Sequence, residues 1–223
     1  MGLTCDLSTI DLFVFDLDGT LVDSRRDIAE SANAVLVECG RAPHSEDTIG
    51  SMVGDGAAVL IARAFEAAGG PVPADGLERF LRIYNQRLLR HTRAYAGIPA
   101  LLDALARRGT LAVLTNKPAI ATRAILDGLG LAGFFGERVL GGDGPHPRKP
   151  DPAGLRQLMA GATMAAARTL MIGDSIVDVR TARGAGALAC VARYGFGFQD
   201  FIMEELETRD LVIDSPLDLL NFL

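Results

Sequence analysis

Two carboxylates separated by a single residue are the first feature of this sequence that could do chemistry. They occur in the motif Asp16-Leu17-Asp18-Gly19-Thr20, directly after a short apolar run. Buried carboxylates are costly unless a positive group or a bound cation compensates their charge. The glycine behind them lets the chain turn tightly. The motif predicts an acidic reaction centre, and a solvated Asp-Gly turn is the alternative.

Three later motifs carry groups that suit the same centre. Thr115 and Asn116 offer a hydroxyl and an amide that can donate to phosphate oxygens. Lys149 precedes a rigid proline, and Asp174 and Asp178 are one helical turn apart. Each has an ordinary alternative: a polar turn, an exposed charge, or acids favoured by a helix N-terminus. Their joint occurrence after apolar runs favours a common site.

The chain contains very few lysines, and both are in or next to the candidate motifs. Of the 22 basic residues, Lys117 and Lys149 are lysines and the other 20 are arginines. Lysine provides a compact point charge, whereas the arginine fork is broad and planar. We interpret Lys149 as functional. Lys117, next to Asn116, is either a surface residue or a contact at the rim of the site.

The apolar runs before these motifs predict a buried parallel sheet. They are short and apolar almost throughout, as in strands covered on both faces. Strands are expected at 10–15, 111–114, 138–140, 169–172, 188–191 and 211–213. Helical patterns fall between them, at 97–108, 118–129, 152–160, 175–186 and 199–207. This alternation predicts an α/β fold with a doubly wound parallel sheet, which binds ligands beyond the carboxyl ends of its strands.

The segment 24–93 interrupts this alternation with helical periods alone. Ser24 and Asp27 resemble a capping box at its start. We therefore expect an inserted α-helical cap at 24–93 and an α/β core formed by 1–23 and 94–223. The cap contains Gly54-Asp55-Gly56, which follows no strand and so does not suit dinucleotide binding. We interpret this motif as a loop that touches the substrate, with a helix-capping turn as the alternative.

Composition limits the partners and the location of the protein. The net charge of −6 disfavours nucleic acid and anionic membranes as partners. Three dispersed cysteines do not form a disulfide framework. The sequence shows no secretion signal and no apolar run of membrane-spanning length. We expect a cytoplasmic protein, and the sequence does not indicate its oligomeric state.

A group of three carboxylates and one lysine needs further positive charge, and Mg²⁺ would supply it. This ion prefers oxygen ligands and is usually held by one or two carboxylates. Asp16 and Asp174 would provide carboxylate oxygens, and Asp18 would provide its backbone carbonyl. The Asp18 side chain would then stay free to transfer protons.

The ordered set of motifs closely resembles the haloacid dehalogenase superfamily over essentially the whole chain. Asp16–Thr20 corresponds to its first motif, Thr115-Asn116 to its second, Lys149 to its third, and Gly173-Asp174 with Asp178 to its fourth. The segment 24–93 falls where that superfamily places a helical cap. The resemblance implies a Rossmann-like core and a magnesium-dependent hydrolase.

The resemblance also implies a role for each motif residue. Asp16 attacks phosphorus to form an aspartyl-phosphate, and Asp18 protonates the leaving oxygen and later activates water. Lys149, Thr115 and Asn116 stabilise the transferring phosphoryl group. Supporting positions are Thr20, Ser175 and Asp178, and the possible substrate contacts are Gly54, Asp55, Gly56 and Lys117.

Four shorter segments resemble the phosphoglycolate phosphatase group of that superfamily. They are Met52–Gly56, Thr115–Pro118, Gly141–Asp143 and Tyr194–Gly197. The substrate implied is a small phosphorylated metabolite, foremost 2-phosphoglycolate. Pyrophosphate, a sugar phosphate and a nucleotide are alternative substrates, and a phospho-acceptor module without turnover is a remote alternative.

Overall fold

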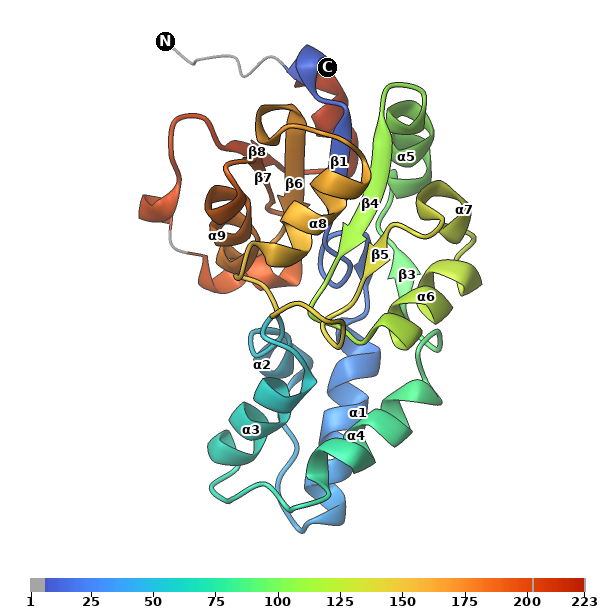
Figure 1. Ribbon diagram of the computed structural model, residues 1–223. Coiled ribbons are helices and arrows are strands. Elements are labelled where there is room, and N and C mark those ends of the chain that lie inside the picture. Colours follow the sequence, from blue (N-terminus) through green and yellow to red (C-terminus); the bar gives the residue numbers. More distant parts are fainter. Residues whose placement is uncertain (1–6, 202, 223) are drawn as a thin grey trace.

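The computed structural model describes residues 7–201 and 203–222, so the first six and the last residue of the predicted core lie outside the described residues. Its centre is a six-stranded parallel sheet in the order β5-β4-β1-β6-β7-β8 (Figure 1). The strands are β1 (Leu12–Phe15), β4 (Thr110–Leu114), β5 (Val139–Leu140), β6 (Thr169–Gly173), β7 (Leu188–Ala192) and β8 (Leu211–Ile213). The predicted doubly wound sheet is confirmed.

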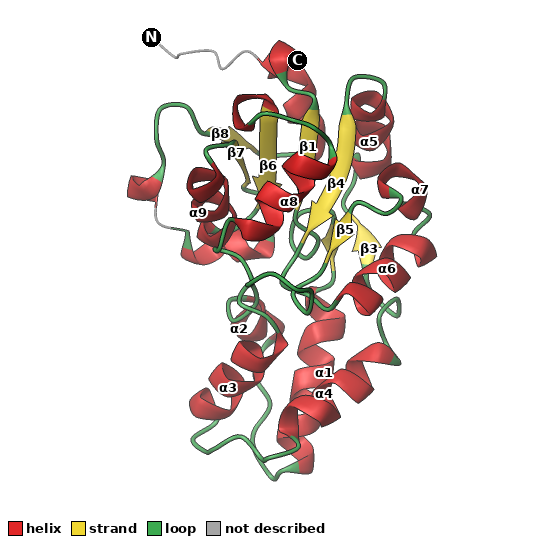
Figure 2. Cartoon of the chain, viewed as in Figure 1, coloured by secondary structure: helices red, strands yellow, loops and turns green. Residues whose placement is uncertain are grey.

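Helices cover both faces of the sheet (Figure 2). One apolar cluster joins the sheet to α5 (Ile98–Ala106), α6 (Ala119–Gly128), α7 (Ala132–Phe135) and the 3-10 segment Pro216–Phe222. A second cluster joins the other face to α8 (Ala153–Gly161) and α9 (Ile176–Ala185). Further 3-10 turns span Leu7–Thr9 and Ala166–Arg168. The sheet is therefore the middle of three layers.

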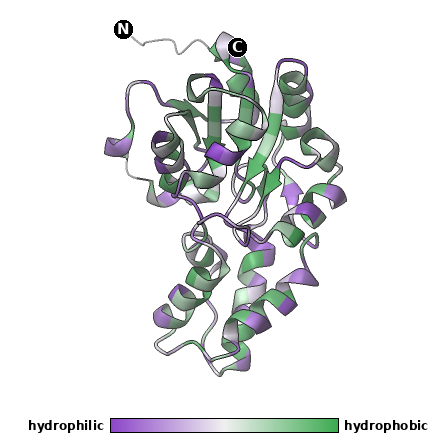
Figure 3. Cartoon of the chain, viewed as in Figure 1, coloured by the Kyte–Doolittle hydropathy of each residue, from purple (hydrophilic) through white to green (hydrophobic). Residues whose placement is uncertain are grey.

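Strand β1 shows why these apolar runs become central strands. Phe13 and Phe15 enter the first cluster, whereas Leu12 and Val14 enter the second. Side chains alternate between the faces of a strand, so a strand covered on both sides must be apolar at every position. All four residues are at most 1% exposed, and the central strands are hydrophobic in colour in Figure 3. The first polar position after this run is Asp16.

Four helices between β1 and β4 form a separate group beyond the carboxyl ends of the strands (Figure 1). They are α1 (Arg25–Glu38), α2 (Glu46–Gly50), α3 (Ala57–Ala67) and α4 (Gly76–Asn85). They share their own apolar cluster, which includes Leu36, Ile61 and Phe65. The antiparallel pair β2 (Val22–Asp23) and β3 (Arg93–Ala94) connects this group to the sheet.

The predicted capping box at the start of α1 is wrong. The Ser24 hydroxyl donates to Asp18 Oδ1 at 2.5 Å and makes no cap hydrogen bond. Asp27 Oδ2 accepts from the backbone N–H groups of His91 and Thr92 and from the Thr92 hydroxyl, each at 2.8 Å. Both side chains are fully buried where the two connecting segments meet. Both side chains therefore form hydrogen bonds with groups across the connection, and not with the first N–H groups of α1.

The predicted helix at 199–207 is also wrong. The described part of this region forms the 3-10 turns Phe196–Asp200 and Met203–Glu205. Gly197 donates its N–H to Asp174 Oδ2 at 2.7 Å, and the rings of Phe198 and Phe201 stack with centroids 5.3 Å apart. These contacts hold the backbone against Asp174, and the chain forms 3-10 turns instead of an α-helix. None of the helices in the described ranges is both long enough and apolar enough to cross a membrane.

Candidate active site

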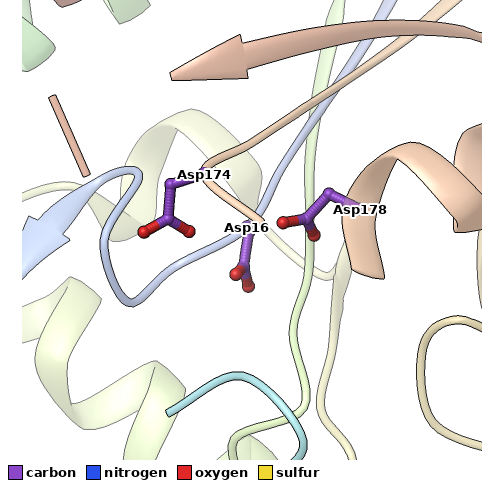
Figure 4. Close-up of side chains that lie close together, drawn as sticks. All are labelled: Asp16, Asp174 and Asp178. Carbon is purple, nitrogen blue, oxygen red and sulfur yellow. The ribbon is translucent and has the colours of Figure 1, made fainter. Parts of the chain in front are cut away.

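Three buried carboxylates meet at the carboxyl edge of the sheet. Asp16 follows β1 and its N–H bonds to the carbonyl of Ile172 in β6, while Asp174 follows β6 and Asp178 lies in α9. One oxygen of each carboxylate lies within 4.8 Å of the other two, and Figure 4 shows them around a common space. The residues are 8%, 2% and 2% exposed, in that order. The sequence motifs 158 residues apart thus converge, as parallel strands require.

Glycines allow the backbone to approach Asp174 closely. Gly19 has φ +83°, and a Cβ at this position would lie 1.8 Å from Asp174 Oδ2. A Cβ at Gly195 would lie 2.2 Å from the carbonyl oxygen of Gly19. Thr20 adds a long contact from its hydroxyl to Asp174 Oδ1 at 3.5 Å. Asp174 is therefore enclosed by the turn after β1 and by the loop that carries Gly197.

Lys149 supplies the positive charge of this centre. Its ammonium lies 2.9 Å from Asp16 Oδ1 and 2.6 Å from Asp178 Oδ1. Asp178 Oδ2 accepts from both the N–H and the hydroxyl of Ser175, at 3.1 and 2.7 Å. Burial acts to lower the pKa of Lys149, but the charges of Asp16 and Asp178 outweigh it and raise that pKa. Asp178 has both oxygens occupied and fixes the position of a charged lysine.

The centre carries more negative charge than Lys149 compensates. Burial raises the pKa of Asp16 to about 6, with Lys149 opposing the rise and Asp178 adding to it. Burial, followed by the charges of Asp16 and Asp178, raises the pKa of Asp174 well above its usual value. Asp16 Oδ1 is buried and forms an ion pair with Lys149, but within the described residues it accepts no hydrogen bond of good geometry. This all-oxygen donor set fits a hard divalent cation.

Asn116 connects Lys149 to the helical group. Its side-chain N–H groups donate to the carbonyls of Lys149 and Gly54, at 3.0 and 2.8 Å, and its Oδ1 accepts from the Lys149 N–H at 2.9 Å. The amide thus has both donors engaged by backbone and holds the loop that carries Lys149. Thr115 is 3% exposed, and its hydroxyl oxygen accepts from the Lys117 N–H at 3.3 Å.

Asp18 lies apart from the three-carboxylate group, on the side of the helices. Lys117 donates to both of its side-chain oxygens, at 2.9 and 2.7 Å, and the Ser24 hydroxyl donates to Oδ1. The ammonium of Lys117 also lies 4.6 Å from the centre of the Tyr84 ring. The Asp18 side chain, which is predicted to transfer protons, is therefore paired with a buried lysine.

A pocket separates these charged groups from the helical group. Its sheet-side wall contains Asp16, Asp18 and Asp174, and its opposite wall contains the apolar side chains of Val53, Leu60, Phe80 and Leu81. Gly54 and Gly56 also line it. Asp55 instead pairs with Arg63 at 2.6 Å and is not among the lining residues. Of the predicted cap loop, only the two glycines reach the pocket.

Sequence reasoning missed two side chains of this site and one loop. Ser24 has the residue type of a helix cap, and Tyr84 has the spacing of an apolar helix face. The segment Tyr194–Gly197 resembles the phosphatase group, but this resemblance does not indicate that its backbone binds Asp174. Lys117 has two signals in sequence, its place next to Asn116 and the scarcity of lysine in the chain.

Comparison with known proteins agrees with this geometry. The family profile described as "haloacid dehalogenase-like hydrolase" matches residues 10–186. The phosphoglycolate phosphatase of Rhodospirillum rubrum is 45% identical over 192 residues, which cover 82% of this chain and 79% of that protein. The phosphoglycolate phosphatase of Agrobacterium fabrum is 39% identical over 92% of this chain and 88% of its own length.

Solved structures give the same result. A crystal structure described as a predicted phosphoglycolate phosphatase from Haemophilus somnus superposes with a TM-score of 0.87 at 30% identity. It covers 96% of this chain, which in turn covers 97% of that structure. The resemblance to hydrolases of the phosphoglycolate phosphatase type is confirmed. The chain therefore belongs to the haloacid dehalogenase-like hydrolase family.

Proposed function

We propose that this enzyme is a phosphatase that converts 2-phosphoglycolate and water into glycolate and inorganic phosphate. The observation that carries the proposal is the position of Asp16, which lies beside Lys149 and Asp174 in the wall of the pocket. The names of the relatives from R. rubrum and A. fabrum support this choice of substrate. A small anionic ester also suits a pocket that has charged groups on one wall.

In the first step, a carboxylate oxygen of Asp16 attacks phosphorus from the side opposite the ester oxygen. The bond between phosphorus and the ester oxygen breaks, and Asp18 in its acid form gives that oxygen a proton. The products of this step are glycolate and the phosphorylated side chain of Asp16. Lys149 and Thr115 stabilise the phosphoryl oxygens, because phosphoryl transfer depends mainly on positioning and charge compensation.

In the second step, Asp18 takes a proton from water while the water oxygen attacks the same phosphorus. The bond between the Asp16 oxygen and phosphorus breaks, so phosphate leaves and the carboxylate is restored. Asp18 recovers its proton and is ready for another cycle. Ser24 and Lys117 hold the Asp18 side chain in one orientation for both transfers.

We propose that the divalent cation of this site is Mg²⁺, held by the carboxylates of Asp16 and Asp174 and by the backbone carbonyl of Asp18. The buried Asp16 oxygen without a hydrogen bond and the raised pKa values of Asp16 and Asp174 support a cation here. When bound, Mg²⁺ would neutralise charge that otherwise repels an anionic phosphate. Asp178, with both oxygens occupied, would act through Lys149 instead.

The proposal includes the predicted division of the chain, with 24–93 as a cap over the core. Its apolar wall would exclude water from the phosphoryl group. Asn116 and Gly54 would connect the cap loop to Lys149. The same proposal places the enzyme in the cytoplasm with a small metabolite as its partner.

The experiment that tests this function is a substrate panel ranked by kcat/KM. It contains 2-phosphoglycolate, pyrophosphate, a sugar phosphate and a nucleotide, each with Mg²⁺ and with EDTA. We expect 2-phosphoglycolate to rank first and turnover to stop in EDTA. A higher rank for another phosphate would overturn the substrate. A single turnover that ends at phosphorylated Asp16 would identify a phospho-acceptor module instead.

A further inference from the structure

Both lysines of the chain are buried in one site, and in the proposed mechanism only Lys149 contacts the phosphoryl group. Lys149 and Lys117 are 5% and 8% exposed, while positive charge elsewhere in the chain is carried by arginine. A buried ammonium is costly and must have compensating partners. The place of Lys117, next to Asp18 and in the pocket wall, raises the question of what else it binds.

Lys117 is charged and has hydrogen-bonding capacity left. Burial acts to lower its pKa, but Asp18 and Tyr84 outweigh burial and raise it. A lysine ammonium has three N–H donors, and the two contacts with Asp18 use at most two of them. The Tyr84 side chain lies against the same ammonium, which is 4.6 Å from the centre of its ring.

Tyr84 provides a second donor at the same place. It is 3% exposed, and in the described part of the chain its hydroxyl makes no hydrogen bond of good geometry, although the Lys117 ammonium lies close enough to interact with it. Burial raises its pKa to about 12, so the hydroxyl keeps its proton and can donate. The ring stacks on Phe80, with centroids 5.6 Å apart and planes 6° apart, so its position is fixed. A buried, unpartnered hydroxyl beside a buried ammonium is suited to an anion.

The position of Lys117 and Tyr84 relative to Asp18 indicates which kind of anion they would bind. Asp18 faces the ester oxygen in the proposed reaction, and Lys117 contacts Asp18 directly. A negative group close to the ester oxygen, on the side away from phosphorus, would meet Lys117 and Tyr84. The cap wall of the pocket contains Leu60 and Leu81, which form no hydrogen bonds with the hydroxyl groups of a sugar, and one polar side chain besides Tyr84, that of Asn85. A carboxylate near the ester oxygen fits these contacts.

We propose that Lys117 and the Tyr84 hydroxyl bind the carboxylate of the substrate and so select phosphate esters of small hydroxy acids. This inference rests on the proposed phosphatase function and extends it to substrate choice. Lys117 comes from the sheet domain and Tyr84 from helix α4. A substrate carboxylate would therefore contact both walls of the pocket at once.

The test compares two esters that differ only in the carboxylate. They are 2-phosphoglycolate and 2-hydroxyethyl phosphate, and the readout is the ratio of their kcat/KM values. We expect Lys117→Met, which keeps the length of the side chain, to lower this ratio roughly 10- to 100-fold. Tyr84→Phe should lower it roughly 3- to 10-fold, mainly through KM for 2-phosphoglycolate. Because Lys117 also contacts Asp18, the ratio is measured instead of either rate alone.

Two controls separate recognition from folding. Ile120→Ala changes a side chain that is 83% exposed at the start of α6, three residues after Lys117, and should leave the ratio unchanged. Lys117→Arg keeps the charge and should retain more of the ratio than Lys117→Met. If Lys117→Met does not fold, as judged by circular dichroism, Tyr84→Phe provides the same measurement from the opposite wall.

The outcomes distinguish this inference from the proposed function. If wild type prefers 2-phosphoglycolate and both variants keep the full preference, the inference is overturned while the function stands. If wild type prefers the phosphate of a larger hydroxy acid and Lys117→Met removes that preference, the inference stands while 2-phosphoglycolate is excluded. Equal kcat/KM values of wild type on the esters with and without the carboxylate would overturn both.

Discussion

The two lysines lie in two differently built regions of one site. Around Lys149, the partners Asp16 and Asp178 come from strand ends and helix starts on a single sheet edge. Around Lys117, the partners are Asp18, Ser24 and Tyr84, from the turn after β1, the connection to the cap, and α4. The first region belongs to the core alone. The second exists only where the core and the helical group meet.

This difference separates two tasks of the proposed enzyme. A centre built on one rigid sheet keeps its geometry whether or not the cap moves, which suits the chemistry at phosphorus. A binding region whose residues come from both the core and the cap changes its geometry when these two parts separate. This property suits recognition of the part of the substrate beyond the phosphoryl group. Substitutions in the first region should therefore affect all substrates equally. Substitutions of Lys117 and Tyr84 in the second region should also change the choice among substrates.

The largest effect is expected from Asp16→Asn, which removes the nucleophile without changing the shape of the side chain. Activity on every ester should fall by at least about 10⁴-fold, with no change in the order of substrates. At pH 7 without metal the variant should be at least as stable as wild type, because a buried charge is removed. Initial rates and urea unfolding check both parts. Residual activity near that of wild type would reject Asp16 as the nucleophile.

Lys149→Met should destabilise the protein through the charges it leaves behind. Asp16 and Asp178 would lose their common partner in a site that is almost fully buried. Breaking such a pair costs about 3–5 kcal/mol when the remaining charge has no compensation. Urea unfolding in EDTA measures this loss, and Asp178→Asn combined with Lys149→Met should recover part of it. An unchanged free energy of unfolding would show that Lys149 does not compensate these carboxylates.

The comparison also explains how much the sequence could predict. Asp16 and Asp174 follow apolar runs, Lys149 lies in a loop before the next helix, and a parallel sheet brings the ends of such runs to one edge. This geometry makes the core region predictable from the order of elements. The interpretation of Asp178 as a supporting residue has the same origin, since it lies one turn into α9.

The second region could be predicted only in part. Asp18 and Lys117 belong to sequence motifs, but Ser24 and Tyr84 have no fixed spacing from them in sequence. The local sequence pattern predicts that Ser24 caps the start of α1, whereas its hydroxyl donates to Asp18. Tyr84 occupies an apolar position of α4 and differs from a core residue only in its unpaired hydroxyl. The segment 199–207 has helix-forming composition, but the preceding loop is held at Asp174. Tertiary contacts decided each of these cases.

The pH dependence of stability is expected to report the excess negative charge of the core region. In EDTA, folded Asp16 keeps its proton up to about pH 6, whereas the unfolded residue loses it near 3.8. The folded state then binds more protons between these values, so stability falls as pH rises through this window, by about 3 kcal/mol. Asp174 acts in the same direction. The raised pKa values of Lys117 and Lys149 lie above this window and add no slope.

Urea unfolding at pH 4.5 and pH 7 measures this slope, and Asp16→Asn is its control because it removes the main titrating group. Mg²⁺ should stabilise the protein more at pH 7 than at pH 4.5, since it binds the ionised carboxylates. A metal-free protein that becomes more stable from pH 4.5 to pH 7 would contradict the proposed excess of buried negative charge.

The smallest effect is expected at Asn116, which connects the two regions. Asn116→Ala removes two donors and one acceptor from the backbone of Lys149 and Gly54. Asn33 offers a matched control, because it exchanges the same kind of hydrogen bonds with the backbone of His44, inside the cap. Each alanine variant should lose about 1–2 kcal/mol of stability. Only Asn116→Ala should also lower kcat/KM, by roughly 10-fold on all esters, through a displaced Lys149. If both variants kept full activity at equal stability, Asn116 would contribute to stability and not to catalysis. Asn116 would then not couple the catalytic region to the cap.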